Sequence, residues 1–209
     1  PGAEAVIARF PEALVHAGPP SKAGRVQAWV VGPGLGDGRQ AEAAVADVLA
    51  ADVPVLVDAD GLRLLNAETV RTRTAPTVLT PHAGEAAALL GTAREEVESG
   101  RLTAVRELAA RYRATVLLKG STTLIAEARD TPVRVNPTGT AYLATAGSGD
   151  VLSGLTGSLL AAGLAPRDAA SVGAYLHGLA ARHGSDGAPV SAQDVADGIP
   201  AAWRDVRAG

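Results

Sequence analysis

The chain of 209 residues contains no cysteine and no methionine, and only 3% of its residues are aromatic. Without cysteine it can form no disulfide, no thiolate metal site and no cysteine nucleophile. With so few aromatic rings, a core must be built from Ala, Val and Leu, and apolar residues make up 47% of the chain. Because position 1 is not methionine, we expect the chain to be preceded by further sequence in a longer polypeptide.

An excess of basic charge and long apolar runs are also missing. The formal net charge is −3, which gives no basic patch for nucleic acid and no polybasic segment for a membrane surface. The uncharged stretch 151–166 is shorter than the roughly 20 apolar residues of a membrane span, and residues 1–20 lack the pattern of a targeting segment. We therefore expect a cytoplasmic protein with neither nucleic acid nor membrane as a partner.

Strand-length apolar runs alternate with segments of helical period. Strands are predicted at 26–31, 54–57, 77–79, 115–118, 122–126 and 133–135. Two amphipathic helical faces are predicted from Ala41, Val45, Val48 and Leu49, and from Leu102, Val105, Leu108, Ala109 and Tyr112. From Asp150 onward the pattern is helical almost to the end. This order predicts one α/β domain over residues 1–209, with a mainly parallel sheet and helices on both faces.

A glycine-rich loop, Gly147-Ser148-Gly149, precedes Asp150, the only charged residue between Val135 and Pro166. Glycines allow backbone N–H groups to turn inward, and the helix N-terminus adds positive potential suited to a phosphate. An aspartate there can accept a proton from a substrate hydroxyl. Alternatively, Asp150 only complements the helix dipole. The charge-free surroundings favour the catalytic interpretation.

Three further loops follow predicted strands. The loop 32–36 reads Gly-Pro-Gly-Leu-Gly and is either a ligand loop or an ordinary turn. We expect Asp58 to face a cleft and Asp60 to cap a short helix. His82, with Glu85 beside it, would face the ligand edge of a parallel sheet, although a lone histidine is more often structural.

The turn at 118–123 carries Lys119, one of only two lysines in a chain with 19 basic residues. A lysine retained under such a bias toward arginine marks a position where an ammonium is needed, and this turn could hold a nucleotide phosphate or ribose. The other lysine, Lys22, has no such explanation. We expect His177 to be a packed or capping residue, and residues 94–101 to form a solvated helix and loop.

Taken in order, the segments GPGLG, VDADGL, LTPHAGE, LLKGSTT and NPTGT…LATAGSGDVLSG resemble the ADP-dependent NAD(P)H-hydrate dehydratases, members of the ribokinase-like superfamily. Residues 11–15 are similar to that family's PE-x-hydrophobic segment, so the resemblance covers nearly the whole chain. Thr140 and Ala146 stand where the family usually has Asn and Gly. The resemblance implies a ribokinase-like three-layer sandwich that lacks its N-terminal portion.

The resemblance also implies an activity. The family uses ADP with Mg²⁺ to phosphorylate the hydroxyl of the S-epimer of hydrated NADH or NADPH, and elimination of phosphate restores the reduced cofactor. No His, Asp and Glu in this sequence have metal-ligand spacing, so Mg²⁺ would arrive with the phosphates. The family tends toward homo-oligomers, so a homo-oligomer is expected here.

Site roles carry over residue by residue as implications of this resemblance. The adenine nucleotide would contact Lys119, Gly120, Ser121, Thr122, Thr123 and Gly149. The hydrated dinucleotide would contact Gly34, Gly36, His82 and Asp150. Asp150 would also act as the base, and the amides of Gly147, Ser148 and Gly149 would form the anion hole.

Two other functions stay open at this point. A small-molecule kinase of the same superfamily, acting on a vitamin-precursor alcohol, would share Asp150 and the anion hole but stop at the phosphorylated product. A nucleotide-binding module without catalysis is the second alternative, and the presence of both Asp150 and Lys119 argues against it.

Overall fold

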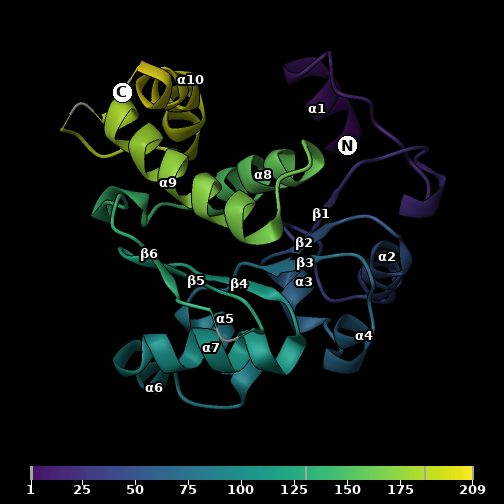
Figure 1. Ribbon diagram of the computed structural model, residues 1–209. Helices are drawn as coiled ribbons and strands as arrows, with labels where there is room; N and C mark the ends of the chain where they lie inside the picture. Colours follow the sequence, from purple (N-terminus) through teal and green to yellow (C-terminus); the bar gives the residue numbers. More distant parts are fainter. Residues whose placement is uncertain (1, 130, 186, 209) are drawn as a thin grey trace.

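The computed structural model describes residues 2–129, 131–185 and 187–208, and its centre is a six-stranded sheet with strands in sequence order (Figure 1). The strands are β1 (Trp29–Val31), β2 (Val55–Val57), β3 (Thr77–Leu79), β4 (Thr115–Leu118), β5 (Thr123–Ala126) and β6 (Arg134–Asn136). Strands β1 to β4 are parallel, and β5 is antiparallel to both β4 and β6. The predicted mainly parallel sheet is therefore confirmed.

Helices cover both faces of the sheet (Figure 1). Parallel neighbouring strands need crossover connections. The helices in these connections cover one face of the sheet and are α2 (Arg39–Ala50), α3 (Asp60–Arg63), α4 (Ala67–Arg71), α5 (Ala83–Leu90), α6 (Arg94–Ser99) and α7 (Arg101–Tyr112). The other face is covered by α8 (Ser148–Ala161) and α9 (Pro166–Ser185), with α10 (Ala192–Ala208) packed on both. These three layers confirm the predicted ribokinase-like architecture.

The strands are apolar at nearly every position because both faces are buried. Neighbouring residues of β2 alternate between the two faces: Val55 and Val57 pack with α2 and α7, whereas Leu56 packs with α8 and α9. The predicted apolar face of α2 is buried at all four positions. On α7 the prediction for Leu102 was wrong, because this side chain lies in the first turn and is 47% exposed.

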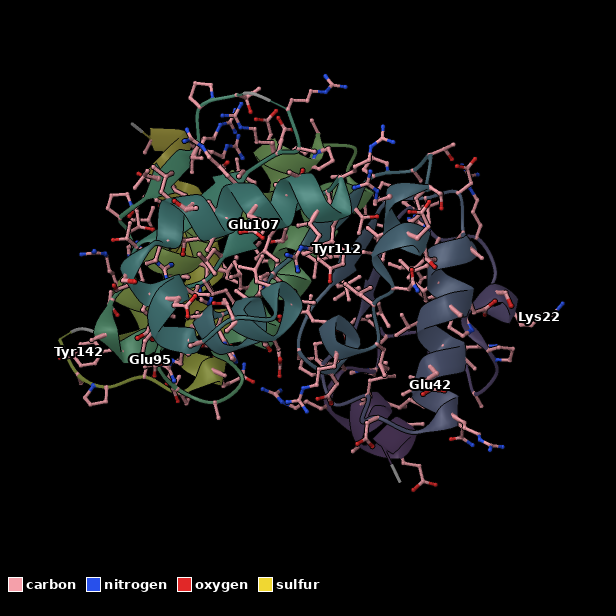
Figure 2. The ribbon with its side chains drawn as sticks, turned by 90° about the horizontal axis from the view of Figure 1, so that it is seen from below. Lys22, Glu42, Glu95, Glu107, Tyr112 and Tyr142 are labelled. Carbon is pink, nitrogen blue, oxygen red and sulfur yellow. The ribbon has the colours of Figure 1, made fainter. Side chains whose placement is uncertain are left out.

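The segment that precedes the sheet in the sequence buries little apolar surface. It contains α1 (Gly2–Arg9) and the short 3-10 helix η1 (Pro20–Lys22), and none of residues 3–30 is buried. The amide of Ser21 donates to Asp47 Oδ2 at 2.7 Å, which holds η1 beside α2. Lys22 points away from the molecule (Figure 2).

Helices within the described ranges are too short or too polar to cross a bilayer.

Candidate active site

All the predicted ligand loops lie at one edge of the sheet. The parallel strands β1 to β4 end at this edge, and antiparallel β5 begins there, so the turn between β4 and β5 also belongs to it. The loop that follows β6 returns to the same edge. Open α/β sheets bind ligands at such an edge.

A cavity of about 640 Å³ opens there. The predicted site residues that line it are His82, Lys119, Gly120, Ser121, Thr123, Gly147, Ser148, Gly149 and Asp150. Gly34, Gly36 and Thr122 do not line it. Most of the predicted nucleotide and anion-hole positions are thus brought together, whereas the two glycines predicted for the dinucleotide lie outside this space.

A buried ion pair lies at the inner end of the cavity. Lys119 Nζ is 2.6 Å from Asp58 Oδ1, and the Asp58 side chain is 1% exposed. Ser153 Oγ donates to the other oxygen, Asp58 Oδ2, at 2.7 Å. Glu85 Oε2 lies 3.7 Å from the same ammonium. Asp58 therefore faces the cleft as expected, and its carboxylate fixes the position of the Lys119 ammonium.

The turn after Lys119 is held by Arg101, which the sequence predicts to lie on a solvated segment. Arg101 Nη2 donates to the carbonyl oxygens of Leu118, Lys119 and Thr122 at 3.1–3.2 Å. Burial lowers the pKa of this guanidinium, and the charge of Glu98 opposes that shift. A Cβ atom at Gly120 would lie 2.6 Å from the same nitrogen, so a side chain at this point of the turn would displace the guanidinium.

Arg94, Glu98 and Arg101 all line the cavity, which corrects the expectation that residues 94–101 are only a solvated segment. A signal was present in the sequence. Arginine is unfavourable in the first turn of a helix, where the dipole is positive, and Arg101 opens α7.

The N-terminus of α8 also lines the cavity, and a Cβ atom at Gly149 would lie 3.4 Å from Lys119 Nζ. Gly147 is its N-cap with φ +83°, a backbone conformation that favours glycine. The amide of Ser148 donates to Thr145 O at 3.3 Å, so it is engaged in this structure. Among the described residues, the amides of Gly147, Gly149 and Asp150 have no backbone acceptor outside the helix. These amides, rather than that of Ser148, are available to an anion.

Asp150 is the third residue of α8 and lines the cavity. It is exposed, and its carboxylate makes no hydrogen bond or ion pair with any residue that the structure describes. A free carboxylate at the mouth of an anion-binding helix end can take a proton from a bound hydroxyl.

His82 combines a structural and a cavity-lining position. Its Nδ1 accepts from the Glu85 amide at 3.1 Å, and Glu85 Oε2 accepts from the His82 amide at 2.8 Å, which is a reciprocal cap of α5. The Lys119 amide donates to Pro81 O at 2.8 Å. These bonds place the His82 loop beside the end of β4.

The loop after β1 is tied to the loop after β2. A Cβ atom at Gly32, where φ is +131°, would lie 1.7 Å from Asp58 O, so only glycine fits. Asp60 Oδ2 accepts from the Gly36 amide at 2.9 Å. The expectation that Asp60 caps α3 was wrong, because the N-cap is Ala59 and has no side-chain cap. Ala59 itself has φ 47° and ψ −126°.

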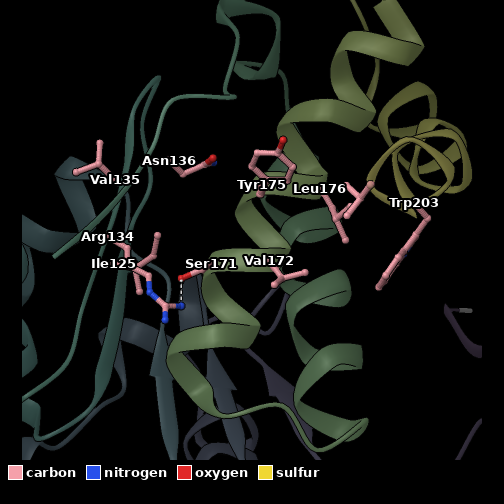
Figure 3. Close-up of a pocket in the computed structure, with 10 residues that line it drawn as sticks. Ile125, Arg134, Val135, Asn136, Ser171, Val172, Tyr175, Leu176 and Trp203 are labelled. Carbon is pink, nitrogen blue, oxygen red and sulfur yellow. Dashed lines mark hydrogen bonds between the residues drawn. The ribbon is translucent and has the colours of Figure 1, made fainter. Parts of the chain in front are cut away.

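A second cavity, of about 440 Å³, lies between β6, α9 and α10 (Figure 3). Its lining is mostly apolar and includes Val172, Tyr175, Leu176 and Trp203. Arg134 also lines this cavity, and its guanidinium is already bound to Asp168 and Ser171. We therefore assign the candidate active site to the first cavity, which the predicted site residues line.

Comparisons with known proteins agree with this geometry. The sequence profile of the NAD(P)H-hydrate dehydratase family matches residues 3–200. The chain is 46% identical over 210 residues to the ADP-dependent (S)-NAD(P)H-hydrate dehydratase of Neisseria meningitidis, covering 97% of this chain and 71% of that protein. It is 53% identical over 178 residues to the bifunctional NAD(P)H-hydrate repair enzyme Nnr of Mycobacterium leprae, covering 84% of this chain but only 37% of that protein.

The fold comparison points the same way. The ADP/ATP-dependent NAD(P)H-hydrate dehydratase of Bacillus subtilis, co-crystallised with ATP/Mg²⁺ and soaked with CoA, superimposes with a TM-score of 0.85 at 30% identity. The match covers 97% of this chain and 77% of that one. Profile, sequence identity and fold together confirm the predicted resemblance, and the chain belongs to the NAD(P)H-hydrate dehydratase family.

Proposed function

We propose that this chain catalyses the ADP-dependent dehydration of the S-epimer of hydrated NADH or NADPH to the reduced cofactor. The observation that carries the proposal is the shared cavity. It places the Lys119 turn, the open amides at the start of α8 and the unpaired carboxylate of Asp150 around one space. Phosphoryl transfer needs these three elements: a phosphate clamp, donors for developing charge and a base. Family membership selects the hydrated dinucleotide as the acceptor.

The chemistry follows from these positions. Asp150 would accept the proton of the substrate hydroxyl while the hydroxyl oxygen attacks the β-phosphorus of ADP. The bond from this phosphorus to the bridging oxygen breaks, and AMP is the leaving group. The amides of Gly147 and Gly149 would stabilise the negative charge on the transferring group. The C–O bond to the phosphate then breaks, inorganic phosphate leaves, and the neighbouring ring carbon loses a proton to solvent. The electron pair of that C–H bond restores the double bond of the reduced nicotinamide.

Binding roles are proposed for the remaining residues. Lys119, the turn 120–123 and Gly149 at the start of α8 would hold the adenine nucleotide. His82, at the end of β3, would contact the hydrated dinucleotide. Gly34 and Gly36 would contact a part of the dinucleotide that extends beyond the cavity, since neither lines it.

Mg²⁺ fits this cavity as a companion of the nucleotide. Within the described ranges no three His, Asp or Glu side chains gather as a cage. Mg²⁺ commonly keeps several waters and uses substrate phosphates with one or two carboxylates, and Glu98 and Asp150 line the space. When bound, the ion would neutralise phosphate charge. Homo-oligomeric assembly and a cytoplasmic location stay predictions.

The direct test incubates the chain with Mg²⁺, ADP and S-NADHX and follows the absorbance of the reduced nicotinamide. We expect recovery of NADH with release of one phosphate per turnover. Accumulation of a phosphorylated alcohol from another substrate, with S-NADHX unchanged, would instead identify a kinase. Nucleotide binding without any conversion would identify a binding module.

Asp150→Asn tests the base. Turnover should fall at least about 100-fold, as expected for loss of a general base, while the dissociation constant for ADP changes less than about twofold. Asp197→Asn, an exposed aspartate on α10, is the matched control and should keep full activity. Loss of ADP binding in Asp150→Asn would show that this residue is structural.

A further inference from the structure

A buried histidine contacts the anion-binding end of α8 from the neighbouring helix. His177 lies on α9, is 6% exposed and lines the first cavity. Its Nε2 is 2.9 Å from the carbonyl oxygen of Ser148. A carbonyl oxygen carries no proton, so Nε2 must be the protonated nitrogen and the ring donates this hydrogen bond.

The acceptor belongs to a peptide group that matters for the cavity. The Ser148 carbonyl and the Gly149 N–H are the two ends of one peptide unit, and in a trans peptide they point in opposite directions. Gly149 lines the cavity, and its amide has no backbone acceptor outside α8 among the described residues. A bond to the carbonyl fixes the direction of this N–H and polarises it, because linked hydrogen bonds strengthen one another.

The ring is neutral in its site. Burial, the largest cause, and the nearby Lys119 charge together lower the pKa of His177 to about 4, although the hydrogen bond to Ser148 acts in the opposite direction. At neutral pH the neutral imidazole therefore carries the Nε2 donor. The neutral ring adds no second charge beside the Lys119 ammonium.

The packing of α9 holds the ring in place. A Cβ at Gly173 would lie 2.4 Å from Thr156 Oγ1 on α8, and a Cβ at Gly178 would lie 2.1 Å from Thr138 Oγ1. Thr138 Oγ1 also donates to Tyr175 O at 3.2 Å. The small residues on either side of His177 thus let α9 approach both α8 and the loop after β6.

We propose that His177 is a positioning residue of the anion hole: by donating to the Ser148 carbonyl, it aims the Gly149 amide at the phosphoryl group in transfer. The proposal goes beyond the proposed function and rests on it for the kinetic part of its test. His177 is buried, as expected of a packed residue, and the proposal adds a role in the site to that expectation.

The test compares His177→Leu, which removes the donor, with His177→Gln, whose amide reaches about as far as Nε2. We expect the Leu variant to lower kcat about 10-fold, less than the roughly 100-fold or more for loss of a direct oxyanion donor. Its KM for ADP should stay within about twofold. The Gln variant should recover most of kcat. His183→Leu, on the same helix but paired with Asp205, is the matched control and should keep wild-type kcat.

A second readout does not depend on turnover. In ¹⁵N–¹H spectra, saturation with ADP and Mg²⁺ should shift the Gly149 amide of the wild type and of His177→Gln. In His177→Leu this shift should fall by at least half, whereas the shift of the Gly120 amide should be retained. If wild-type protein binds ADP but leaves S-NADHX unchanged, the proposed function fails and this spectrum alone decides the role of His177.

Two results would overturn the proposal. One is a His177→Leu variant with wild-type kcat and an unchanged Gly149 shift. The other is an equal loss of kcat in the Leu and Gln variants that tracks a common fall in Tm, which is the signature of a purely structural role. If His177→Leu does not fold, His177→Asn, whose amide is too short to reach the carbonyl, takes its place.

Discussion

Two ion pairs in this molecule have the same nitrogen–oxygen distance of 2.6 Å but lie in different surroundings. The pair between Lys119 and Asp58 is nearly buried, with side chains 18% and 1% exposed. The pair between Arg134 and Asp168 is 42% and 52% exposed. Water screens the second pair, whereas removing one partner of the first leaves a charge in a poorly solvated place.

Matched Asp→Asn variants measure this difference. Asp58→Asn should lower the free energy of unfolding by about 3 kcal/mol, typical of breaking a buried pair. Asp168→Asn should lower it by less than about 1 kcal/mol. Urea unfolding of both variants at neutral pH checks the prediction, and equal losses would contradict it.

His177 also predicts a pH dependence of stability. Its pKa in the folded protein is about 4, below the ordinary value of 6.5. Well above pH 6.5 the ring is neutral in both states and contributes nothing to the pH dependence. As the pH falls from 6.5 to about 4, the unfolded chain binds a proton that the folded chain does not, so stability falls by at most about 3 kcal/mol.

Urea midpoints of wild type and His177→Gln between pH 7 and about pH 4 isolate this contribution, because glutamine does not titrate. The difference in stability between the two proteins should be constant above pH 6.5 and should move in favour of the variant below it. Parallel curves over the whole range would show that this histidine titrates normally in the fold.

At the scale of elements, the start of α7 supports the turn between β4 and β5. Arg101→Met keeps an apolar stem but removes the donors to three carbonyl oxygens. The turn should loosen and the dissociation constant for ADP should rise about 10-fold, which corresponds to the roughly 1–3 kcal/mol of unsatisfied buried groups. Arg106→Met, at an exposed position of the same helix, is the control. Calorimetric titration with ADP distinguishes the two variants. An unchanged affinity in Arg101→Met would contradict the role of Arg101 in holding the turn.

The elements differ in how well the sequence alone predicted them. The strands at 77–79 and 115–118 were predicted with their observed bounds because loop residues bracket each apolar run. The first strand was predicted from residue 26 but begins at Trp29. Its length is set by its partner, since β1 pairs with only the three residues of β2, and pairing partners are not visible in a local pattern.

The residues of the site also differ in how well the sequence alone predicted them. Lys119, Gly149 and Asp150 were predicted because they lie in short motifs at strand and helix ends, which a parallel sheet gathers at one edge. Arg101 and His177 were not predicted as site residues, because each binds backbone carbonyls at least 17 positions away in the sequence. Backbone acceptors leave no residue-type signature, so the signal for Arg101 was its place in the first turn of a helix rather than its partners.

For the whole molecule, burial predicts an order of backbone opening. The core of β2, β3 and β4 is fully buried, whereas none of residues 3–30 is. Hydrogen–deuterium exchange should therefore be slowest in these strands and fastest in residues 3–28. ADP with Mg²⁺ should add protection at 118–123 and 147–150, and none at 199–206 beside the apolar cavity. Protection at 199–206 instead would place the nucleotide in the apolar second cavity and would contradict the proposed site.

The backbone of Ala59 has a consequence for which sequences this fold accepts. In an extended strand, residues two apart share a face, yet Asp58 reaches Lys119 and Asp60 reaches the Gly36 amide. The reversal occurs at Ala59, whose positive φ suits glycine better than any residue with a Cβ. In a saturation library selected for folding, position 59 should admit Gly readily and exclude Val, Ile and Thr. Substitutions of the two flanking aspartates should be selected independently of each other, since one serves the cavity and the other a loop.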